Sequence, residues 1–234
     1  MYLKPDEEEV VIFQQFKDKV KDLDQSDETL IRFLRARDYD IPNAEKMLRS
    51  ATQWREEIGI DNCLKWEFPP NYESDLPYKL FGKDYDGAPI CWVFAGKWTT
   101  KKLVENEESE HVLRYDYSVM EKGLRRIVEC GTAGVIVLDM EGLSFAQATH
   151  IPSLKLSYIV LQTIEQCYPE IAKAVYVINV PWVFSFAYNF IKGVIAPKTL
   201  AKVKIISSKD EWHAEFLKKF PVDSIVPELQ PPSC

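Results

Sequence analysis

Apolar residues in the first third of the chain recur at helical spacing behind two residues that commonly begin helices. Ser26 precedes two acidic residues, which favour a first helical turn, and Asp40 precedes Pro42, which a first turn tolerates. The apolar residues that follow are Leu30, Phe33, Leu34, Ala44, Met47, Leu48, Ala51 and Trp54. Their spacing of three and four predicts two amphipathic helices. A weaker helix is expected over residues 7–21.

After a proline-containing boundary at residues 67–78, the apolar positions follow the pattern of buried strands. We expect strands over residues 88–95, 134–140, 174–180 and 203–207, and helices over residues 109–128 and 154–166. Such alternation indicates parallel strands joined by helical crossovers, and the near-continuous β-branched runs are typical of strands covered on both faces. The predicted fold class is α/β. An all-helical N-terminal lobe (residues 1–75) packs on a domain with a mixed, mainly parallel β-sheet (residues 76–234).

Residues 182–195 form a helix-length segment that carries one charge and is apolar around most of its circumference. A helix that is apolar on both sides is either buried in a large core or lines something apolar. Two interpretations remain open. The segment is buried on both sides by protein, or it packs on the sheet by one face and meets a ligand or a bilayer with the other.

The charges are divided unevenly along the chain. Residues 1–75 hold 11 basic and 18 acidic side chains and residues 76–234 hold 18 of each, so the net charge of −7 belongs to the first third. This balance argues against a nucleic-acid partner bound through overall positive charge. Between residues 171 and 208 the charged side chains are all basic: Lys173, Lys192, Lys198, Lys202 and Lys204. Such a tract is either a solvated face or a surface for anionic lipid head groups.

The cysteines and the N-terminus favour a reducing compartment, so we expect a cytoplasmic protein. The five cysteines are odd in number and form no CxxC pair, and acidic residues stand where a signal peptide would be basic and then apolar. The longest uncharged run, residues 174–191, contains Pro181 and falls short of the ~20 apolar residues that a spanning helix needs.

The sequence offers little that points to catalysis. It contains no GxxxxGK[ST], GxGxxG or GxSxG motif, and its three histidines are isolated, so we expect no cofactor and no metal site. Asp139 ends a predicted buried strand, where catalytic carboxylates often lie in open α/β sheets. The alternative is a carboxylate that caps a turn. We expect a protein that is not an enzyme.

Four segments together resemble the CRAL-TRIO lipid-binding family, which includes the yeast phosphatidylinositol/phosphatidylcholine transfer protein. They are residues 30–40 (LIRFLRARDYD), 82–90 (GKDYDGAPI), 137–144 (VLDMEGLS) and the tract from Tyr168 to Phe184. They occur in the family's order, and the resemblance covers about residues 10–225. Residues 59–62 with Trp66, and residues 187–192, look most like the animal branch called supernatant protein factor or tocopherol-associated protein.

The resemblance implies a lipid cavity floored by the sheet and closed by a mobile gate helix that matches residues 184–195. The implied gate and cavity-lining residues are Trp182, Phe184, Phe186, Ala187, Phe190, Ile191 and Val194. The implied head-group contacts are Arg37, Glu170, Thr199 and Lys202. Two cations suit a phosphodiester, and a hydroxyl with a carboxylate suits inositol hydroxyls. The alternative is an ion pair between Glu170 and Lys202, with Arg37 joining the lobe to the domain. Asp38 departs from the family, which often has a second basic residue there.

The function expected from the resemblance is lipid binding and transfer inside the cell. A monomer would extract one phospholipid, phosphatidylinositol or phosphatidylcholine, and carry it between membranes that it contacts transiently. Opening of the gate is expected to expose Phe186 and Phe190. The alternatives are a carrier of tocopherol, a retinoid, squalene or a carotenoid, an enzyme centred on Asp139, and an interaction module with a filled interior. The carrier hypotheses require an apolar hollow between the sheet and the phenylalanine-rich segment.

Overall fold

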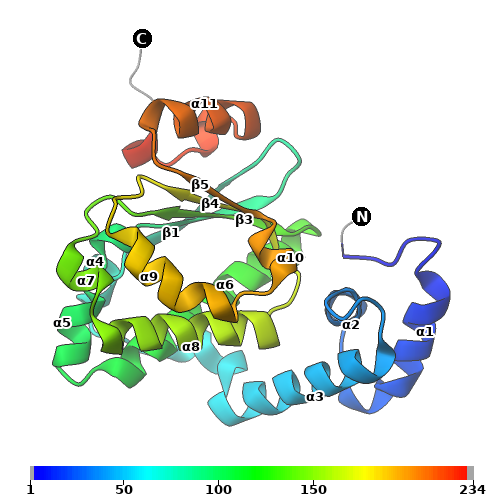
Figure 1. Cartoon of the computed structure of the whole chain (residues 1–234). Coiled ribbons are helices and arrows are strands. Elements are labelled where there is room, and N and C mark those ends of the chain that lie inside the picture. The colour runs from blue at the N-terminus through cyan, green and yellow to red at the C-terminus, as the bar shows by residue number, and fades with distance from the viewer. Residues whose placement is uncertain (1–2, 231–234) are drawn as a thin grey trace.

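The computed structural model describes residues 3–230 and arranges them as a helical lobe beside a five-stranded sheet that carries helices on both faces (Figure 1). The helices are α1 (Val10–Lys19), α2 (Asp27–Arg35), α3 (Ile41–Ile58), α4 (Tyr72–Asp75), α5 (Thr100–Glu105), α6 (Ser109–Cys130), α7 (Phe145–Ala148), α8 (Ile151–Cys167), α9 (Phe184–Ile191), α10 (Pro197–Leu200) and α11 (Lys209–Lys219). The strands are β1 (Tyr78–Lys83), β2 (Pro89–Val93), β3 (Gly134–Asp139), β4 (Ala172–Ile178) and β5 (Val203–Ile206).

The helices of the lobe begin where the sequence predicts, because both predicted capping residues accept a backbone hydrogen bond. The Ser26 side chain accepts the backbone N–H of Thr29 at 3.2 Å and begins α2, and Asp40 accepts that of Asn43 at 3.0 Å and begins α3. A hydrogen bond to an otherwise unpaired backbone N–H at the start of a helix stabilises the folded protein by ~1 kcal/mol. Gly59, at φ +66°, ends α3 in a left-handed conformation. The expected helix over residues 7–21 is present as the shorter α1.

The sheet has the order β1-β2-β3-β4-β5, and every neighbouring pair after the first is parallel. Strands β2 to β5 confirm the four predicted strands, and α6 and α8 confirm the two predicted crossover helices. The sequence analysis missed β1, which pairs antiparallel with β2 and forms an edge of the sheet. Its residues alternate between half-buried and exposed, so it lacks the continuous apolar run of the buried strands.

The two faces of the sheet are covered differently. On one face, Trp92 and Tyr176 pack against Phe216 and Phe220 of the α11 region, with ring centroids 5.6–6.0 Å apart. Figure 1 shows α11 on this side and α8 and α9 on the other. The residues that alternate with this packed set, among them Ile136 of β3, point toward the helices on the opposite face. That opposite face holds the candidate site.

The lobe and the sheet domain share one hydrophobic core. Buried residues of α1, α2 and α3 form one cluster with Ile127, Tyr168 and Ile171 of the sheet domain. At its edge, Arg55 of α3 contacts the buried Glu121 of α6 at 3.0 Å, and Tyr168 donates to the same carboxylate at 3.1 Å. The division at residue 75 stays a prediction. The shared core argues that both parts unfold together.

Candidate functional site

An apolar cavity of about 280 Å³ lies between the sheet and helices α6 and α8. Its floor includes Ile136 and Leu138 of β3, and its walls include Met120 of α6 and Leu161 of α8. Ile136 and Leu138 are only half-buried although β3 is central in the sheet, because the space beside them is hollow. The interior is therefore not filled by side chains, as the carrier hypotheses require.

The predicted gate segment meets this cavity through a single residue. Of the seven predicted gate residues, Ile191 lines the cavity. Phe184 is buried with Val175 and Val177 of β4, and Ala187 and Val194 are half-buried. The hollow is thus enclosed mainly by α6 and α8, and α9 closes one side of it.

Three aromatic residues of the same segment face solvent. Trp182, Phe186 and Phe190 are 73%, 51% and 38% exposed. The expectation that opening of a gate exposes Phe186 and Phe190 is therefore wrong, since both side chains are already exposed in this structure. Phe145 of α7 lies 6.1 Å from Trp182 and 5.9 Å from Phe186 between ring centroids. We call Phe145, Trp182 and Phe186 the aromatic patch.

The four predicted head-group residues line one small pocket. Arg37 comes from the turn after α2, Glu170 from the turn before β4, Thr199 from α10 and Lys202 from the turn after it. All four are half-buried, and the pocket measures about 60 Å³. Its lining shares Ile164 and Ile171 with the apolar cavity, so a charged pocket adjoins the hollow.

The charged groups of this pocket already have partners. Lys202 Nζ lies 2.9 Å from Glu170 Oε2, which is the ion pair of the alternative interpretation. Arg37 donates to the carbonyl of Ala36 at 2.8 Å, within the lobe. Asp38 is ion-paired with Lys198. Helix α10 ends at Leu200, and the Lys202 N–H donates to the Thr199 carbonyl at 3.0 Å, so a turn keeps the two residues together.

The basic tract is neutralised by acids that are distant in sequence. Lys173 binds Asp84 and Asp86 at 2.6 and 2.5 Å, and Lys204 binds Glu215 at 2.7 Å. Lys198 and Lys202 have the partners given above. Among the residues that the structure describes, Lys192 makes no ion pair. Four of the five lysines of the basic tract thus have acidic partners, and the choice between a solvated face and a surface for lipid head groups stays open.

Asp139 fits the turn interpretation. Its Oδ1 accepts the Glu141 N–H at 3.0 Å and the Asn179 Nδ2 at 2.9 Å. Asn179 in turn accepts the indole N–H of Trp212 at 2.9 Å. Asp139 thus joins the ends of β3 and β4 to α11. Within residues 3–230, no group of three or more His, Cys, Asp or Glu side chains could hold a metal ion.

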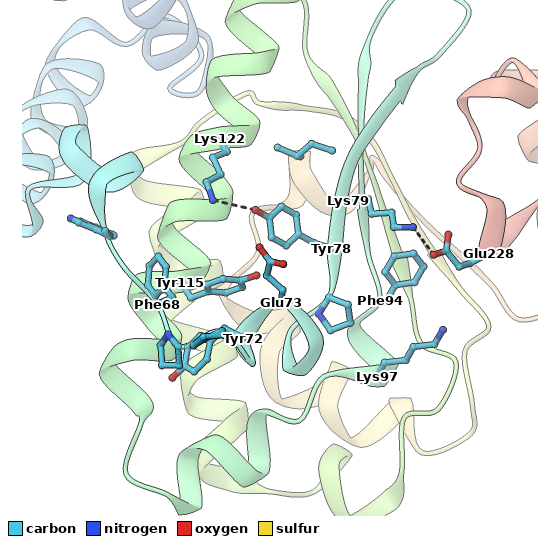
Figure 2. A pocket seen from close by; sticks show the side chains of 15 residues that line it. Phe68, Tyr72, Glu73, Tyr78, Lys79, Phe94, Lys97, Tyr115, Lys122 and Glu228 are labelled. Carbon is cyan, nitrogen blue, oxygen red and sulfur yellow. Dashed lines mark hydrogen bonds and ion pairs between the residues drawn. The ribbon is translucent and has the colours of Figure 1, made fainter.

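A second cavity, of about 880 Å³, lies beyond the β1 edge of the sheet and was not predicted (Figure 2). Figure 2 shows the rings of Phe68, Tyr72 and Tyr115 on one side and the ion pair of Lys79 with Glu228, at 2.5 Å, on the other. Its walls mix aromatic rings with ionic groups, and it opens to solvent. Hydrocarbon suits the smaller cavity better, because that lining is almost wholly apolar.

The comparisons with known proteins agree with this arrangement. The family model of the CRAL/TRIO domain matches residues 74–229, and that of the CRAL/TRIO N-terminal domain matches residues 4–50. The chain belongs to the CRAL-TRIO lipid-binding family. The resemblance seen in the sequence is thereby confirmed. No helix within residues 3–230 has the length and apolar character needed to cross a membrane.

Several curated CRAL-TRIO relatives are similar over most of the chain. The Sec14 cytosolic factor of Schizosaccharomyces pombe is 30% identical over 218 residues, which are 87% of this chain and 73% of that protein. The protein real-time of Aedes aegypti is 28% identical over 214 residues, and that of Anopheles gambiae is 30% identical over 196. The chain spans 33% and 28% of these two proteins.

A solved structure supports the fold. The crystal structure of Sfh5 superposes with a TM-score of 0.74 at 19% identity, covering 88% of this chain and 82% of that one. The helical N-terminal lobe and the mainly parallel sheet are therefore confirmed as the family's fold.

Proposed function

We propose that this protein binds a single lipid, phosphatidylinositol or phosphatidylcholine, and carries it between membranes without covalent chemistry. The observation that carries the proposal is an apolar hollow of about 280 Å³ with a charged pocket at one end. Exposing a 16-carbon chain to water costs ~13 kcal/mol at ~0.8 kcal/mol per methylene. A cavity that accepts the chain directly from the bilayer avoids most of this cost. The proposal includes a monomer located in the cytoplasm.

In this proposal the hydrocarbon fills the cavity and the head group enters the pocket beside it. Arg37 and Lys202 bind the phosphodiester, while Glu170 and Thr199 bind hydroxyls of inositol. Because Glu170 and Lys202 are 2.9 Å apart, a phosphate must take the place of the carboxylate at Lys202. After that exchange, Glu170 Oε2 accepts hydrogen bonds from the sugar ring.

Loading requires the gate to move. Ligand pockets usually measure ~300–1,000 Å³, so a hollow of about 280 Å³ beside a pocket of about 60 Å³ lies at the lower end of this range and has to enlarge to take up a whole phospholipid. Helix α9 is the element to move, since Ile191 holds it at the cavity while much of its outer face is already exposed. A 3₁₀ turn over Lys192–Val194 follows it and contains Gly193, at which an added Cβ would meet no atom within 4 Å.

Replacing Lys202 with alanine should remove phosphatidylinositol from the protein. The variant loses one of two cations for the phosphate, and we expect at least a tenfold lower yield of the lipid, about 1.4 kcal/mol. Mass spectrometry of organic extracts of the purified protein measures the yield. Lys204→Ala is the matched control, because Lys204 binds Glu215 and lies over the Tyr176 ring on the α11 side. Equal lipid in both variants would exclude the head-group role.

Membrane docking should depend on the aromatic patch more than on charge. Each exposed ring that enters the bilayer contributes ~2 kcal/mol, whereas four of the five lysines of the basic tract are already paired. We expect Trp182→Ala with Phe186→Ala to weaken binding to phosphatidylcholine vesicles more than tenfold in co-sedimentation. Val222→Ala, at another exposed apolar residue, is the control. Strong loss of wild-type binding in 0.5 M salt would show that charge dominates instead.

The alternative carried over from the sequence is a carrier of a hydrophobic small molecule such as tocopherol, a retinoid, squalene or a carotenoid. The modest volume of the hollow favours a ligand with little more than one chain or ring system. The same extracts discriminate the two functions, because a terpenoid recovered without phospholipid supports the alternative.

A further inference from the structure

The apolar cavity contains one polar side chain that has no partner among the described residues. Asp116 of α6 lines the cavity and is 8% exposed, and it makes no hydrogen bond or ion pair with any residue that the structure describes. The other nitrogen- or oxygen-bearing side chains of the lining have partners. Trp98 donates to Pro77 O at 3.1 Å, Ser157 to Ser153 O at 3.2 Å, and Arg126 to the carbonyls of Leu80 and Gly82.

Asp116 lies at the end of the cavity away from the head-group pocket. Met120, Gly123 and Ile127 follow it along the cavity face of α6. Ile127 belongs to the same buried cluster as Ile171, which borders the head-group pocket. The eleven steps along the helix from Asp116 to Ile127 span ~16 Å at ~1.5 Å each. A head group bound by Lys202 therefore cannot be the partner of Asp116.

The surroundings of Asp116 favour a neutral carboxyl. Burial alone raises the pKa of Asp116 to about 7, since no cation lies close to it. Burial likewise raises the pKa of the phenols of Tyr115 and Tyr117, the neighbours on its own helix, and both stay neutral at pH 7. Ser157 of α8 and Trp98 carry no charge, and burial raises the pKa of the Cys91 thiol of β2 to about 12. Arg126, ten residues along α6, is bound to carbonyls.

We propose that the Asp116 end of the cavity binds the hydroxyl group of a neutral lipid alcohol, a single hydrocarbon chain or ring system that ends in one hydroxyl. A protonated carboxyl both donates and accepts a hydrogen bond, as a hydroxyl does, so one such pair satisfies both groups. A plain hydrocarbon leaves Asp116 unpaired. An anionic phosphate would be repelled by the ionised carboxylate and would find no cation beside it. This inference rests on the proposed carrier function, because it concerns the same cavity, and it favours the small-molecule alternative over a phospholipid.

The test compares two probes with one hydrocarbon skeleton, farnesol and farnesene, by calorimetric titration of the delipidated full chain. We expect the wild type to bind farnesol at least tenfold more tightly than farnesene. In Asp116→Leu the two affinities should become equal, because farnesol loses its partner while farnesene does not. Asp116→Asn keeps a donor and an acceptor and should restore the preference for the alcohol.

The pH dependence gives a second readout. The ligand's hydrocarbon displaces the water that remains around Asp116, which disfavours the carboxylate, so farnesol binding to the wild type should weaken as pH rises from 6 to 8.5. Asp116→Asn should bind equally across this range. A wild type that binds both probes equally, or an Asp116→Leu variant that keeps the preference, overturns the inference while leaving the carrier proposal intact. Tighter binding of farnesylamine than of farnesol also overturns it. If the wild type binds neither these probes nor phospholipid, the carrier proposal itself fails.

Discussion

Replacement of Gly123 with leucine should abolish lipid retention and make the empty protein more stable. Gly123 lies on the cavity face of α6, and a Cβ added there would meet no atom within 4 Å. The leucine side chain therefore enters the space that the hydrocarbon needs. Its burial contributes ~2 kcal/mol, and removing a glycine from a helix interior contributes up to ~1 kcal/mol more. We expect the free energy of unfolding to rise by about 1–3 kcal/mol.

Two measurements on the same preparation check this result. Mass spectrometry of extracts reports the retained lipid, and denaturant unfolding of the delipidated protein reports stability. Glu129→Leu is the matched control, since it adds leucine to an exposed position of the same helix. If Gly123→Leu still carries one lipid per chain, the hydrocarbon lies elsewhere. The cavity of Figure 2 is then the place to examine.

The parts of the fold that were predictable are those whose signal is local. Ser26 and Asp40 mark helix starts by a hydrogen bond three residues away. Strands β2, β3 and β4 are mostly apolar because both faces of the sheet are covered, and the edge strand β5 is apolar at three of its four residues. Strand β1 was missed because an edge strand needs no such run. Helix α11 was also missed, although Trp212 and Phe216 are four residues apart, a spacing that indicates an apolar stripe.

The candidate site was predictable only in part, because its contacts are distant in sequence. The resemblance named four residues that the structure brings into one pocket. No local pattern indicates that Lys198 contacts Asp38 or that Lys173 contacts Asp84, since those acids are 160 and 89 residues away along the chain. The phenylalanine-rich segment was expected to line the hollow. Instead, α6 and α8 enclose the hollow, and Ile191 is the one residue of that segment that lines it.

Asp116 escaped the sequence analysis although its position carried a signal. It lies four residues after Val112 and four before Met120, so helical spacing places it on the apolar stripe of α6. A charged residue on such a stripe is either paired or functional, and only the structure shows that it is unpaired. An unpaired polar side chain in an apolar cavity is expected in ligand-binding sites, where a few polar groups orient a mostly apolar ligand.

Substituting Asp116 with asparagine should raise the free energy of unfolding of the delipidated protein at pH 8 by up to about 4 kcal/mol. Burial raises the pKa of Asp116 from 3.8 to about 7. Because a tenfold change in a protonation equilibrium corresponds to ~1.4 kcal/mol, this difference amounts to about 4 kcal/mol of folding free energy. An acid whose pKa is higher in the folded state binds more protons folded than unfolded. The contribution of Asp116 to folding is therefore most favourable below pH 4 and is lost as pH rises from 4 to 7. Asparagine is neutral throughout and avoids the loss.

Denaturant unfolding of both proteins at pH 4, 6 and 8 checks this sign. The difference between variant and wild type should be close to zero at pH 4, because a neutral carboxyl and an amide are nearly isosteric, and should grow at each higher pH. Asp223→Asn, at an exposed carboxylate, is the control and should show little difference at any pH. A difference for Asp116→Asn that stays constant with pH would mean that Asp116 remains ionised in the folded protein. The carboxylate would then have a cationic or hydrated partner inside the cavity, and a neutral alcohol would not be its ligand.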